Sequence, residues 1–272
     1  MTESAVRLEY RDRIAVMTLD REEKRNAFDE SMWRGLEGAV AALRADLPRA
    51  LVITGAGERA FCAGFDVSLE NPQVERMAEA IQKGSRSRAE ALLRYIRGVV
   101  DGLATLPVPV IAAVNGLAYG GGAELAVRCD LRVMDPGARF CFSEVRLGLM
   151  PDWGGGVALA RLLGGSRAAD LILTARKVEA DEALRIGLVN RVSAPGKSRD
   201  EALAMAGMIT ANGPRAVRSA LAVIRRAAGL APGEALEFET MVAADLIASG
   251  ECIHGITAFL GGKEPEFPDP ES

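Results

Sequence analysis

Hydrophobic and polar residues along the chain follow two patterns, one typical of buried strands and one typical of amphipathic helices. Short apolar runs bounded by turn residues predict strands, and apolar residues at every third or fourth position predict helices. The predicted strands lie at 14–19, 50–54, 110–114, 131–134, 139–142 and 188–192. The predicted helices among them lie at 30–43 and 89–99, and one more begins at Gly121.

The last part of the chain has a helical pattern only. Four helices are predicted there, at 201–209, 214–228, 233–249 and 251–260. A body of alternating strands and helices followed by helices alone predicts an α/β fold with a smaller helical C-terminal domain. Pro195 and Gly196 mark a hinge at 193–198, so we expect one domain at 1–198 and a second at 199–272.

Composition argues against several classes of partner. The chain has 272 residues, of which 49% are hydrophobic, enough to bury a large core. Its net charge of −4 predicts no nucleic-acid partner and no anionic membrane partner. No apolar run approaches the roughly 20 residues that span a bilayer, and the acidic start of the chain does not resemble a signal peptide. We therefore expect a cytoplasmic protein whose four cysteines are reduced and mostly buried.

The chain has a single histidine, and this restricts its chemistry. His254 lies in a helical pattern near the C-terminus, and no nucleophile motif accompanies it. The cysteines show no paired spacing, and no Cys-x-x-Cys or two-histidine arrangement is present to bind a metal. We expect His254 to be a structural residue, and we expect acid–base chemistry from carboxylates without a metal.

The most informative stretch is the glycine corner at 119–126, where a predicted strand opens into a helix. Gly120, Gly121 and Gly122 precede Glu124, the first acid of that helix. Free N–H groups at a helix start bind an anion, either a phosphate or an oxyanion that forms during a reaction. The alternative is a tight turn whose glycines allow close packing, with Glu124 as an ordinary first-turn acid.

Two further segments place polar residues beside small ones. The loop 60–66 follows a predicted strand and offers backbone N–H groups to a cleft, or it is a loop closed by Asp66 as a helix cap. Glu144 lies among apolar and small residues, where burial would raise its pKa, unless Arg146 or another cation pairs with it. Asp152 follows a proline and is placed to cap the next helix.

Together these segments resemble the crotonase superfamily of enoyl-CoA hydratases and isomerases. The matching segments run in the family's order along almost the whole chain: 24–28, 61–66, 110–116, 120–126, 142–144, 148–151 and 258–263. The resemblance implies a spiral of ββα turns with a helical C-terminal trimerisation domain, assembled as a homotrimer or a dimer of trimers. It also implies an acyl-CoA thioester as the substrate, so that coenzyme A arrives with the substrate and no cofactor is needed.

The resemblance also implies roles for individual residues. The backbone N–H groups of Ala63 and Gly121 would form an oxyanion hole for the thioester oxygen, worth on the order of 5–8 kcal/mol as a pair. Glu124 would help to activate a water molecule, and Glu144 would be the main acid that protonates C2. Two glutamates favour a hydratase that adds water across the C2=C3 bond of a 2-enoyl-CoA, because the family's isomerases commonly have an apolar residue at one of these positions.

Asp152 and Trp153 depart from the hydratase pattern, which usually has small residues there. Some members of the family with other chemistries use an aspartate near this place, so an isomerase that uses Asp152 is the alternative function. Trp153 would narrow the acyl pocket or stack on an aromatic acyl group, unless it only packs in the core. A non-catalytic acyl-CoA-binding homologue is a third alternative, against which the two glutamates argue.

The resemblance further implies substrate contacts from several parts of the chain. Residues 71–97 would line the acyl pocket. Lys24 and Arg25 would approach the phosphates of coenzyme A, unless they form a solvated charge pair with neighbouring glutamates. Phe259 and Lys263 would complete the site of a neighbouring subunit. The full set of implied contacts is Lys24, Arg25, Ala27, Phe28, Ala63, Gly64, Phe65, Asp66, Gly120, Asp152, Trp153, Phe259 and Lys263.

Overall fold

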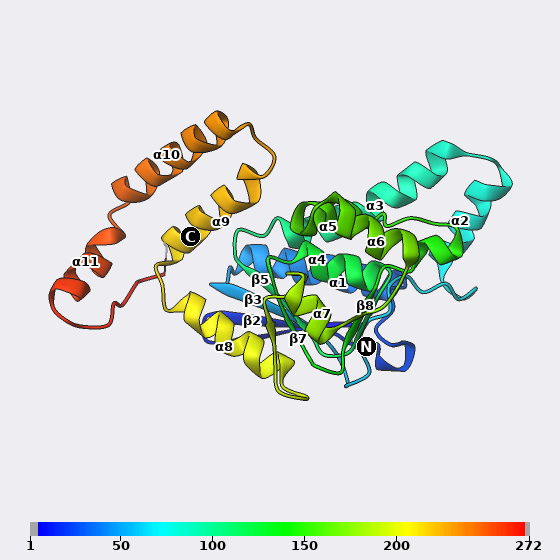
Figure 1. Cartoon of the computed structure of the whole chain (residues 1–272), viewed down its shortest axis with the longest axis horizontal. Helices are drawn as coiled ribbons and strands as arrows, with labels where there is room; N and C mark the ends of the chain where they lie inside the picture. Colours follow the sequence, from blue (N-terminus) through cyan, green and yellow to red (C-terminus); the bar gives the residue numbers. More distant parts are fainter. Residues whose placement is uncertain (1–4, 270–272) are drawn as a thin grey trace.

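The computed structural model describes residues 5–269, which form two β-sheets, the helices that cover them and a helical arm (Figure 1). The first sheet has the strand order β1-β2-β3-β5-β7-β10, and only β1 runs antiparallel to its neighbour. The second sheet has the order β4-β6-β8-β9. The strands are β1 (Val6–Arg11), β2 (Ile14–Leu19), β3 (Ala50–Gly55), β4 (Ala60–Cys62), β5 (Val110–Val114), β6 (Leu117–Tyr119), β7 (Leu131–Met134), β8 (Arg139–Cys141), β9 (Val178–Glu179) and β10 (Arg191–Val192).

From β3 to β8, consecutive strands alternate between the two sheets, and this alternation produces a spiral. β3, β5 and β7 join the first sheet, and the strands that follow them, β4, β6 and β8, join the second. Helices complete each turn: α2 (Pro72–Gln82) and α3 (Arg86–Ala104) after β4, α4 (Gly121–Arg128) after β6, and α5 (Gly155–Leu163) and α6 (Gly165–Thr174) after β8. The predicted α/β spiral of ββα turns with a helical C-terminal region is confirmed.

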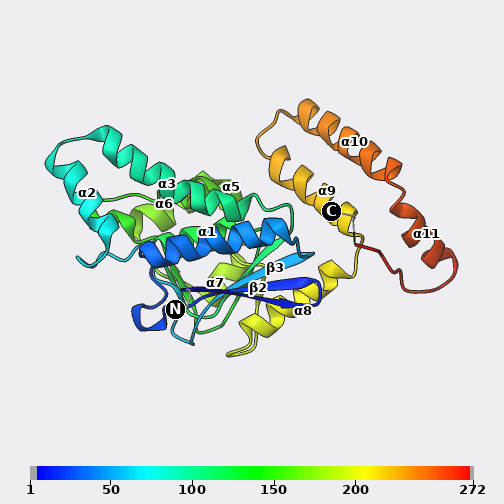
Figure 2. The ribbon, with the colours of Figure 1, turned by 180° about the vertical axis from the view of Figure 1, so that it is seen from behind.

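The two faces of the first sheet are covered by different helices (Figure 2). Successive strand residues point to opposite faces, so neighbouring apolar residues enter separate clusters. Leu51 packs in the larger cluster with residues of α1 (Glu30–Ala45) and α3. Val52, the next residue, packs with Met205 of α8 (Ser198–Thr210) on the other face. This two-sided burial explains why the central strands are continuous apolar runs in the sequence.

Helix α1 illustrates how the sequence pattern determines packing. Asp29 caps its start by accepting a hydrogen bond from the N–H of Met32 at 3.0 Å. Its apolar residues recur at helical spacing and are buried, and each large one contributes about 1.5–3 kcal/mol of burial free energy. Trp33 is one of them and is fully buried.

The helices α9 (Pro214–Ala227), α10 (Pro232–Ala248) and α11 (Cys252–Leu260) form an arm that projects from the body (Figures 1 and 2). Neither α10 nor α11 has a buried residue. The predicted domain boundary at 198–199 groups α8 with these helices, whereas α8 covers the first sheet. At the base of the arm the Arg49 guanidinium binds the Asp269 carboxylate at 2.5 Å.

The predicted strands and helices are all present, with ends shifted by a few residues. The strand predicted at 188–192 is shorter, because the N–H groups of Leu188 and Val189 both bind the carbonyl of Ala183 in a buried turn. The sequence pattern missed β4, β6 and β9, which have only two or three residues, and β1, in which charged residues alternate. It also missed α2, α6 and the short helix α7 (Ala180–Arg185), and it indicated α5 only as the helix expected after Asp152.

The cysteines and the histidine lie as predicted. All four cysteines are free, and only Cys252 is exposed. His254 is exposed on α11. Between residues 5 and 269, no helix combines the length and the apolar character that crossing a membrane requires.

Candidate active site

Residues of the predicted site come together where three consecutive strands of the second sheet end. The loop 63–66 follows β4, the corner of Gly120 and Gly121 follows β6, and a 3₁₀ turn that begins at Glu144 follows β8. Because β4, β6 and β8 are parallel neighbours, the segments at their carboxyl ends meet at one edge of the sheet. These segments, with Asp152 and Trp153, line a cavity of about 570 Å³.

Ala63 does not offer the free N–H group that was predicted. Its N–H donates a hydrogen bond to the carbonyl of Arg25 at 3.0 Å, so it is not available to a thioester oxygen. Two residues further on, the N–H of Phe65 has no acceptor anywhere in the described part of the chain. The prediction of Ala63 as an oxyanion donor is therefore wrong, and Phe65 supplies the free donor of this loop.

The direction of the Phe65 N–H follows from the bridge between Phe28 and Phe65. Phe28 donates to the carbonyl of Gly64 at 2.7 Å and accepts from the N–H of Asp66 at 2.9 Å. These bonds use the carbonyl of Gly64 and the N–H of Asp66, which flank Phe65. The N–H of Phe65 itself therefore points away from Phe28. Gly64, with a φ of +88°, brings the loop close to the glycine corner, since a Cβ there would lie 2.9 Å from the nitrogen of Gly121.

Gly121 supplies the second donor, because its N–H has no acceptor among residues 5–269. It is the first residue of α4, so its N–H has no acceptor within the helix, and the helix dipole favours negative charge in front of it. A Cβ at this position would lie 2.5 to 2.6 Å from three carbon atoms of the Trp153 indole. Both interpretations of the glycine corner therefore apply: it packs tightly, and it presents an N–H group to the cavity.

Glu124 lies one helical turn after Gly121 and is only 1% exposed. Its carboxylate accepts three backbone hydrogen bonds, from Asp152 at 3.1 Å, from Trp153 at 2.8 Å and from Gly155 at 2.8 Å. Gly155 is the first residue of α5, so Glu124 caps that helix from a distant part of the sequence. The prediction that Asp152 caps this helix is wrong, because the cap position is Gly154 and no side chain caps it locally.

Glu144 contributes the second carboxyl and interacts with Glu124. Both of its carboxylate oxygens are buried, and neither has a hydrogen-bond partner among residues 5–269, so the ion pair with Arg146 is not formed. Burial raises the pKa of Glu144. Burial, and then the charge of Glu144, raises the pKa of Glu124 to about 9. Such a pair titrates as a unit and retains one proton at neutral pH.

Asp152 adds a third carboxyl to the same cavity. Burial, and then the charge of Glu144, raises the pKa of Asp152 to about 6. At neutral pH this group is therefore mostly ionised and places a negative charge beside the glutamate pair. A titration near physiological pH within a cavity is typical of functional carboxyls.

Trp153 is buried, with 3% of its surface exposed. Its ring centroid lies 5.3 Å from that of Phe28 and 4.7 Å from that of Trp33, both in edge-to-face geometry. Of the roles considered for Trp153, this burial favours core packing. Phe28 is fully buried in the same cluster, so its ring does not reach a substrate.

The far part of the cavity has apolar walls. Helices α2 and α3 contribute Met77, Ile81, Leu93 and Ile96, among others, within the predicted acyl-binding region. The chain after β8 adds Leu147, Leu149 and Met150. Ile81 and Met150 are 73% and 68% exposed, and they lie with the other apolar side chains of this cavity in one group. The walls therefore suit an apolar acyl group.

A smaller hollow of about 350 Å³ adjoins the main cavity, since Ala63 and Ser143 line both. Three cations also line it: Arg25, Arg139 and Lys177. Arg139 pairs with Glu179 at 2.9 Å, but Lys177 forms no ion pair with a described residue. The sequence pattern predicted only Arg25, because the two other cations lie far from it along the chain.

Three predicted contacts are occupied or hidden in the protein itself. Lys24 pairs with Glu70 at 3.9 Å and lines neither hollow. The Asp66 carboxylate accepts a hydrogen bond from Arg21 at 2.6 Å. Burial opposes the ionisation of Asp66, but hydrogen bonds from the backbone of Ser68 and from Arg21 lower its pKa overall. Ala27 is buried, and the contacts of these three residues with a substrate stay predictions.

Phe259 belongs to α11, which lies at the opposite end of the molecule from α2 and α3, the helices that line the cavity (Figure 1). Phe259 is 83% exposed on α11, and Lys263 follows that helix. Within one chain they do not contribute to the site, so their predicted role in a neighbouring subunit stays a prediction.

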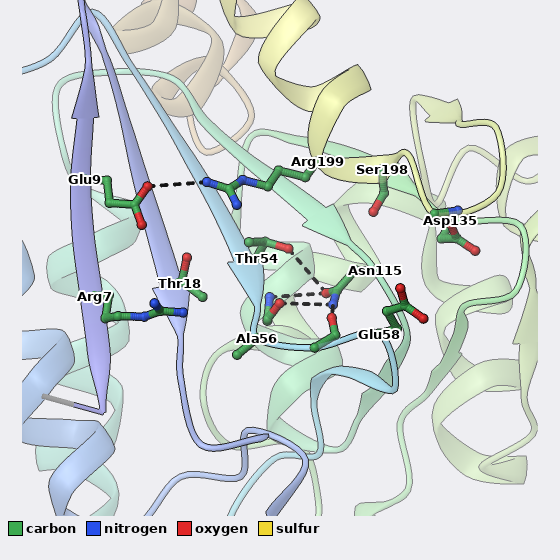
Figure 3. A pocket seen from close by; sticks show the side chains of 13 residues that line it. Arg7, Glu9, Thr18, Thr54, Ala56, Glu58, Asn115, Asp135, Ser198 and Arg199 are labelled. Atoms are coloured by element: carbon green, nitrogen blue, oxygen red, sulfur yellow. Dashed lines mark hydrogen bonds and ion pairs between the residues drawn. The ribbon is translucent and has the colours of Figure 1, made fainter. Parts of the chain in front are cut away.

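A separate polar cavity of about 480 Å³ lies at the carboxyl ends of strands of the first sheet (Figure 3). Asn115 joins the ends of β3 and β5 there, because its side-chain amide accepts from the N–H of Gly55 at 3.2 Å and donates to its carbonyl at 3.0 Å. Arg199 reaches Glu9 across the same cavity at 3.5 Å. None of the predicted site residues lines it. The candidate active site is therefore the cavity beside Gly121.

Comparisons with known proteins identify the family. The model of one family, described as enoyl-CoA hydratase/isomerase, matches residues 9–270. The chain belongs to this family. Among its relatives, the short-chain-enoyl-CoA hydratase of Clostridium acetobutylicum is 36% identical over 95% of each chain. The crotonyl-CoA hydratase of Syntrophomonas wolfei is 33% identical over 96% of each chain.

Solved structures of the enoyl-CoA hydratase/isomerase family share the fold. An enoyl-CoA hydratase from Bacillus anthracis superposes with a TM-score of 0.87 at 30% identity, covering 96% of this chain and 98% of the other. One from Mycobacterium smegmatis gives 0.86 at 33% identity, covering 97% and 99%. The predicted membership of the crotonase superfamily is confirmed.

Proposed function

We propose that this enzyme is an enoyl-CoA hydratase, a hydro-lyase that adds water across the C2=C3 bond of a 2-enoyl-CoA. The observation that carries the proposal is the pair of interacting buried carboxyls, Glu124 and Glu144, beside the free N–H of Gly121. Relatives that match almost the full length of the chain are named as hydratases. The reaction needs no group other than the coenzyme A that the substrate carries.

The thioester oxygen binds between the N–H groups of Phe65 and Gly121. As water adds to C3, negative charge develops on this oxygen as an enolate, and both hydrogen bonds strengthen. One such donor is typically worth about 2.7–4 kcal/mol of the barrier. A single general acid or base, at ~10²–10⁴-fold, supplies roughly 3–5 kcal/mol. The two donors together therefore contribute more than either glutamate alone.

The glutamate pair moves the protons. Glu124, as a carboxylate, accepts a proton from water while the water oxygen bonds to C3. The two glutamates share one proton, and in the form that reacts this proton is on Glu144, which transfers it to C2. Glu124 then holds the proton taken from water, so the pair still carries one proton afterwards. Three N–H donors support the ionised form of Glu124, whereas no described residue donates to Glu144. This contrast supports the assignment of the base to Glu124 and of the acid to Glu144.

Coenzyme A extends from the thioester into the adjoining hollow. Arg25, Arg139 and Lys177 line this hollow and would neutralise phosphate charge, with Lys177 free of any ion pair within residues 5–269. The apolar walls from α2 and α3 receive the acyl chain.

The arm supports assembly as a homotrimer or a dimer of trimers. It carries large apolar side chains that one chain leaves in solvent, among them Leu236 at 65%, Ile256 at 56% and Phe259 at 83% exposure. Exposed apolar surface of this extent is typical of an interface between subunits.

An enoyl-CoA isomerase is the second candidate, and one observation favours it. The Asp152 carboxyl lines the cavity beside the glutamates, and its pKa of about 6 suits a group that removes and returns a proton. In that reaction Asp152 would move a proton between two carbons of the acyl chain, and no water would be added.

The two candidates are separated by offering 2-enoyl-CoA and 3-enoyl-CoA thioesters and following the mass of the product. We expect a gain of one water with the 2-enoyl substrates, and we expect this gain to vanish in Glu144→Ala. Migration of the double bond without a change in mass, lost in Asp152→Ala and retained in Glu144→Ala, would refute the hydratase assignment.

A further inference from the structure

The indole ring of Trp153 lies directly against one half of the oxyanion hole. Three of its carbon atoms lie within 2.5 to 2.6 Å of the place that a Cβ on Gly121 would occupy. No positive φ is required at Gly121, so its backbone alone would accept alanine. The ring is therefore the contact that restricts Gly121 to glycine and limits the movement of its N–H.

The same ring is connected to the other half of the oxyanion hole through Phe28. The rings of Trp153 and Phe28 meet edge to face, and each also contacts Trp33, with centroids 4.4 to 5.3 Å apart in the three pairs. The backbone of Phe28 holds the loop that carries Phe65, through hydrogen bonds of 2.7 Å and 2.9 Å. One packed cluster thus contacts Gly121 and aligns Phe65.

Trp153 also acts on the acid–base pair through its backbone. Its N–H donates to the Glu124 carboxylate at 2.8 Å. The side chain and the main chain of one residue therefore touch an oxyanion donor and a catalytic carboxylate, although the residue is only 3% exposed.

We propose that Trp153 is a positioning residue, whose ring fixes the spacing between the N–H groups of Phe65 and Gly121. The inference rests on the proposed function, because it concerns the donors that bind the thioester oxygen. Such donors act only at about 2.7–3.1 Å from the oxyanion, and a displacement of ~1 Å costs on the order of 10²-fold in rate. An aromatic cluster is rigid enough to hold this spacing, because packed rings resist displacement.

The test reads the polarisation of a bound thioester directly. A conjugated 2,4-dienoyl-CoA absorbs at longer wavelength when hydrogen bonds draw charge onto its carbonyl oxygen. In Trp153→Ala we expect this shift on binding to shrink and kcat to fall about 10- to 100-fold, with KM changed less than kcat. Trp153→Phe keeps a ring and should restore part of both. Trp33→Phe is the matched control, since Trp33 belongs to the same cluster without contacting Gly121, and it should lower stability while keeping the shift.

A second pair of variants covers the case in which Trp153→Ala folds poorly. Gly121→Ala alone should lose the shift, because its new methyl group meets the indole. Gly121→Ala combined with Trp153→Phe, whose smaller ring leaves room, should recover part of the shift. An unchanged shift in Trp153→Ala, or no recovery in the double variant, would overturn the proposal. A wild-type enzyme that shifts the dienoyl spectrum but adds no water would refute the hydratase assignment and leave the role of Trp153 intact.

Discussion

Replacing Glu124 with glutamine tests whether one side chain serves both the fold and the reaction. In the wild type its carboxylate accepts backbone hydrogen bonds from Asp152, Trp153 and Gly155. Glutamine has one carbonyl oxygen and an amino group that cannot accept. With the carbonyl in the position of Oε2, the bonds from Trp153 and Gly155 remain, and the N–H of Asp152 loses its acceptor. A donor left without an acceptor costs about 1–3 kcal/mol, which is the expected decrease in the free energy of unfolding at pH 5.

The loss of stability in Glu124→Gln depends on pH, and the raised pKa of Glu124 determines in which direction. The ordinary pKa of a glutamate is 4.5, and the pKa of Glu124 in the folded protein is about 9. Between these two pH values the folded state therefore binds more protons than the unfolded state. The contribution of the protonated Glu124 to the free energy of unfolding is complete below pH 4.5 and is lost as pH rises through about 9. Glutamine does not titrate. The deficit of the variant should therefore shrink as pH rises from 5 to 9, by on the order of a few kcal/mol.

The measurement is urea unfolding of both proteins at several pH values, followed by tryptophan fluorescence. Glu144→Gln is the matched control, because Glu144 has no hydrogen bond to lose to a described residue. It should cost little stability at pH 5. Both variants should lose hydration of a 2-enoyl-CoA by ~10²–10⁴-fold. Parallel stability curves for wild type and Glu124→Gln from pH 5 to pH 9 would refute the raised pKa, and hydration within tenfold of wild type would refute the catalytic role.

Two further predictions concern the margins of the site. Asp152→Asn should remove an inflection near pH 6 from the profile of kcat/KM against pH, because Asp152 becomes ionised as pH rises through its pKa of about 6. Hydration should remain in this variant, and an unchanged profile would show that Asp152 does not titrate in the cavity. Lys177→Ala should raise KM for acyl-CoA thioesters roughly tenfold and weaken the dependence of KM on salt, with kcat retained. Lys24→Ala is its control, because Lys24 does not line the hollow and pairs with Glu70, and equal effects of the two variants would contradict the placement of the phosphates.

The sequence was sufficient to predict the features that depend on local order. Glycines before Glu124 at a strand-to-helix junction, and Glu144 among apolar residues, are visible in single segments. The fold class followed from the order of strands and helices. The short strands β4 and β6 were missed, because three residues carry too little periodicity to distinguish a strand from a loop.

The predicted oxyanion donor, Ala63, lies two residues before the free donor, Phe65, and the prediction was wrong for a related reason. The sequence shows that Gly64 allows an unusual backbone conformation, but it does not show which N–H group of the loop remains free. That depends on the pairing of Phe28 with Phe65 and on the carbonyl of Arg25, which lies almost forty positions before its partner Ala63. The cap of α5 was missed likewise, because Glu124 reaches it from thirty-one positions away. Contacts of this range arise from tertiary packing alone.

The three segments that form the site come from three successive turns of the spiral, and this order has a consequence for how the enzyme changes in evolution. The groups that stabilise the enolate follow β4 and β6, whereas Glu144 and Asp152 both lie after β8. Substitutions of Glu144 and Asp152 therefore alter which proton is moved, whereas Trp153, in the same segment, packs against the donor Gly121. Asp152 and Trp153, which depart from the hydratase pattern in the sequence, both lie in this third turn. The spiral thus places the two donors to the enolate on earlier turns than Glu144 and Asp152, so that substitutions at these two carboxyls, within a single segment, give access to new reactions.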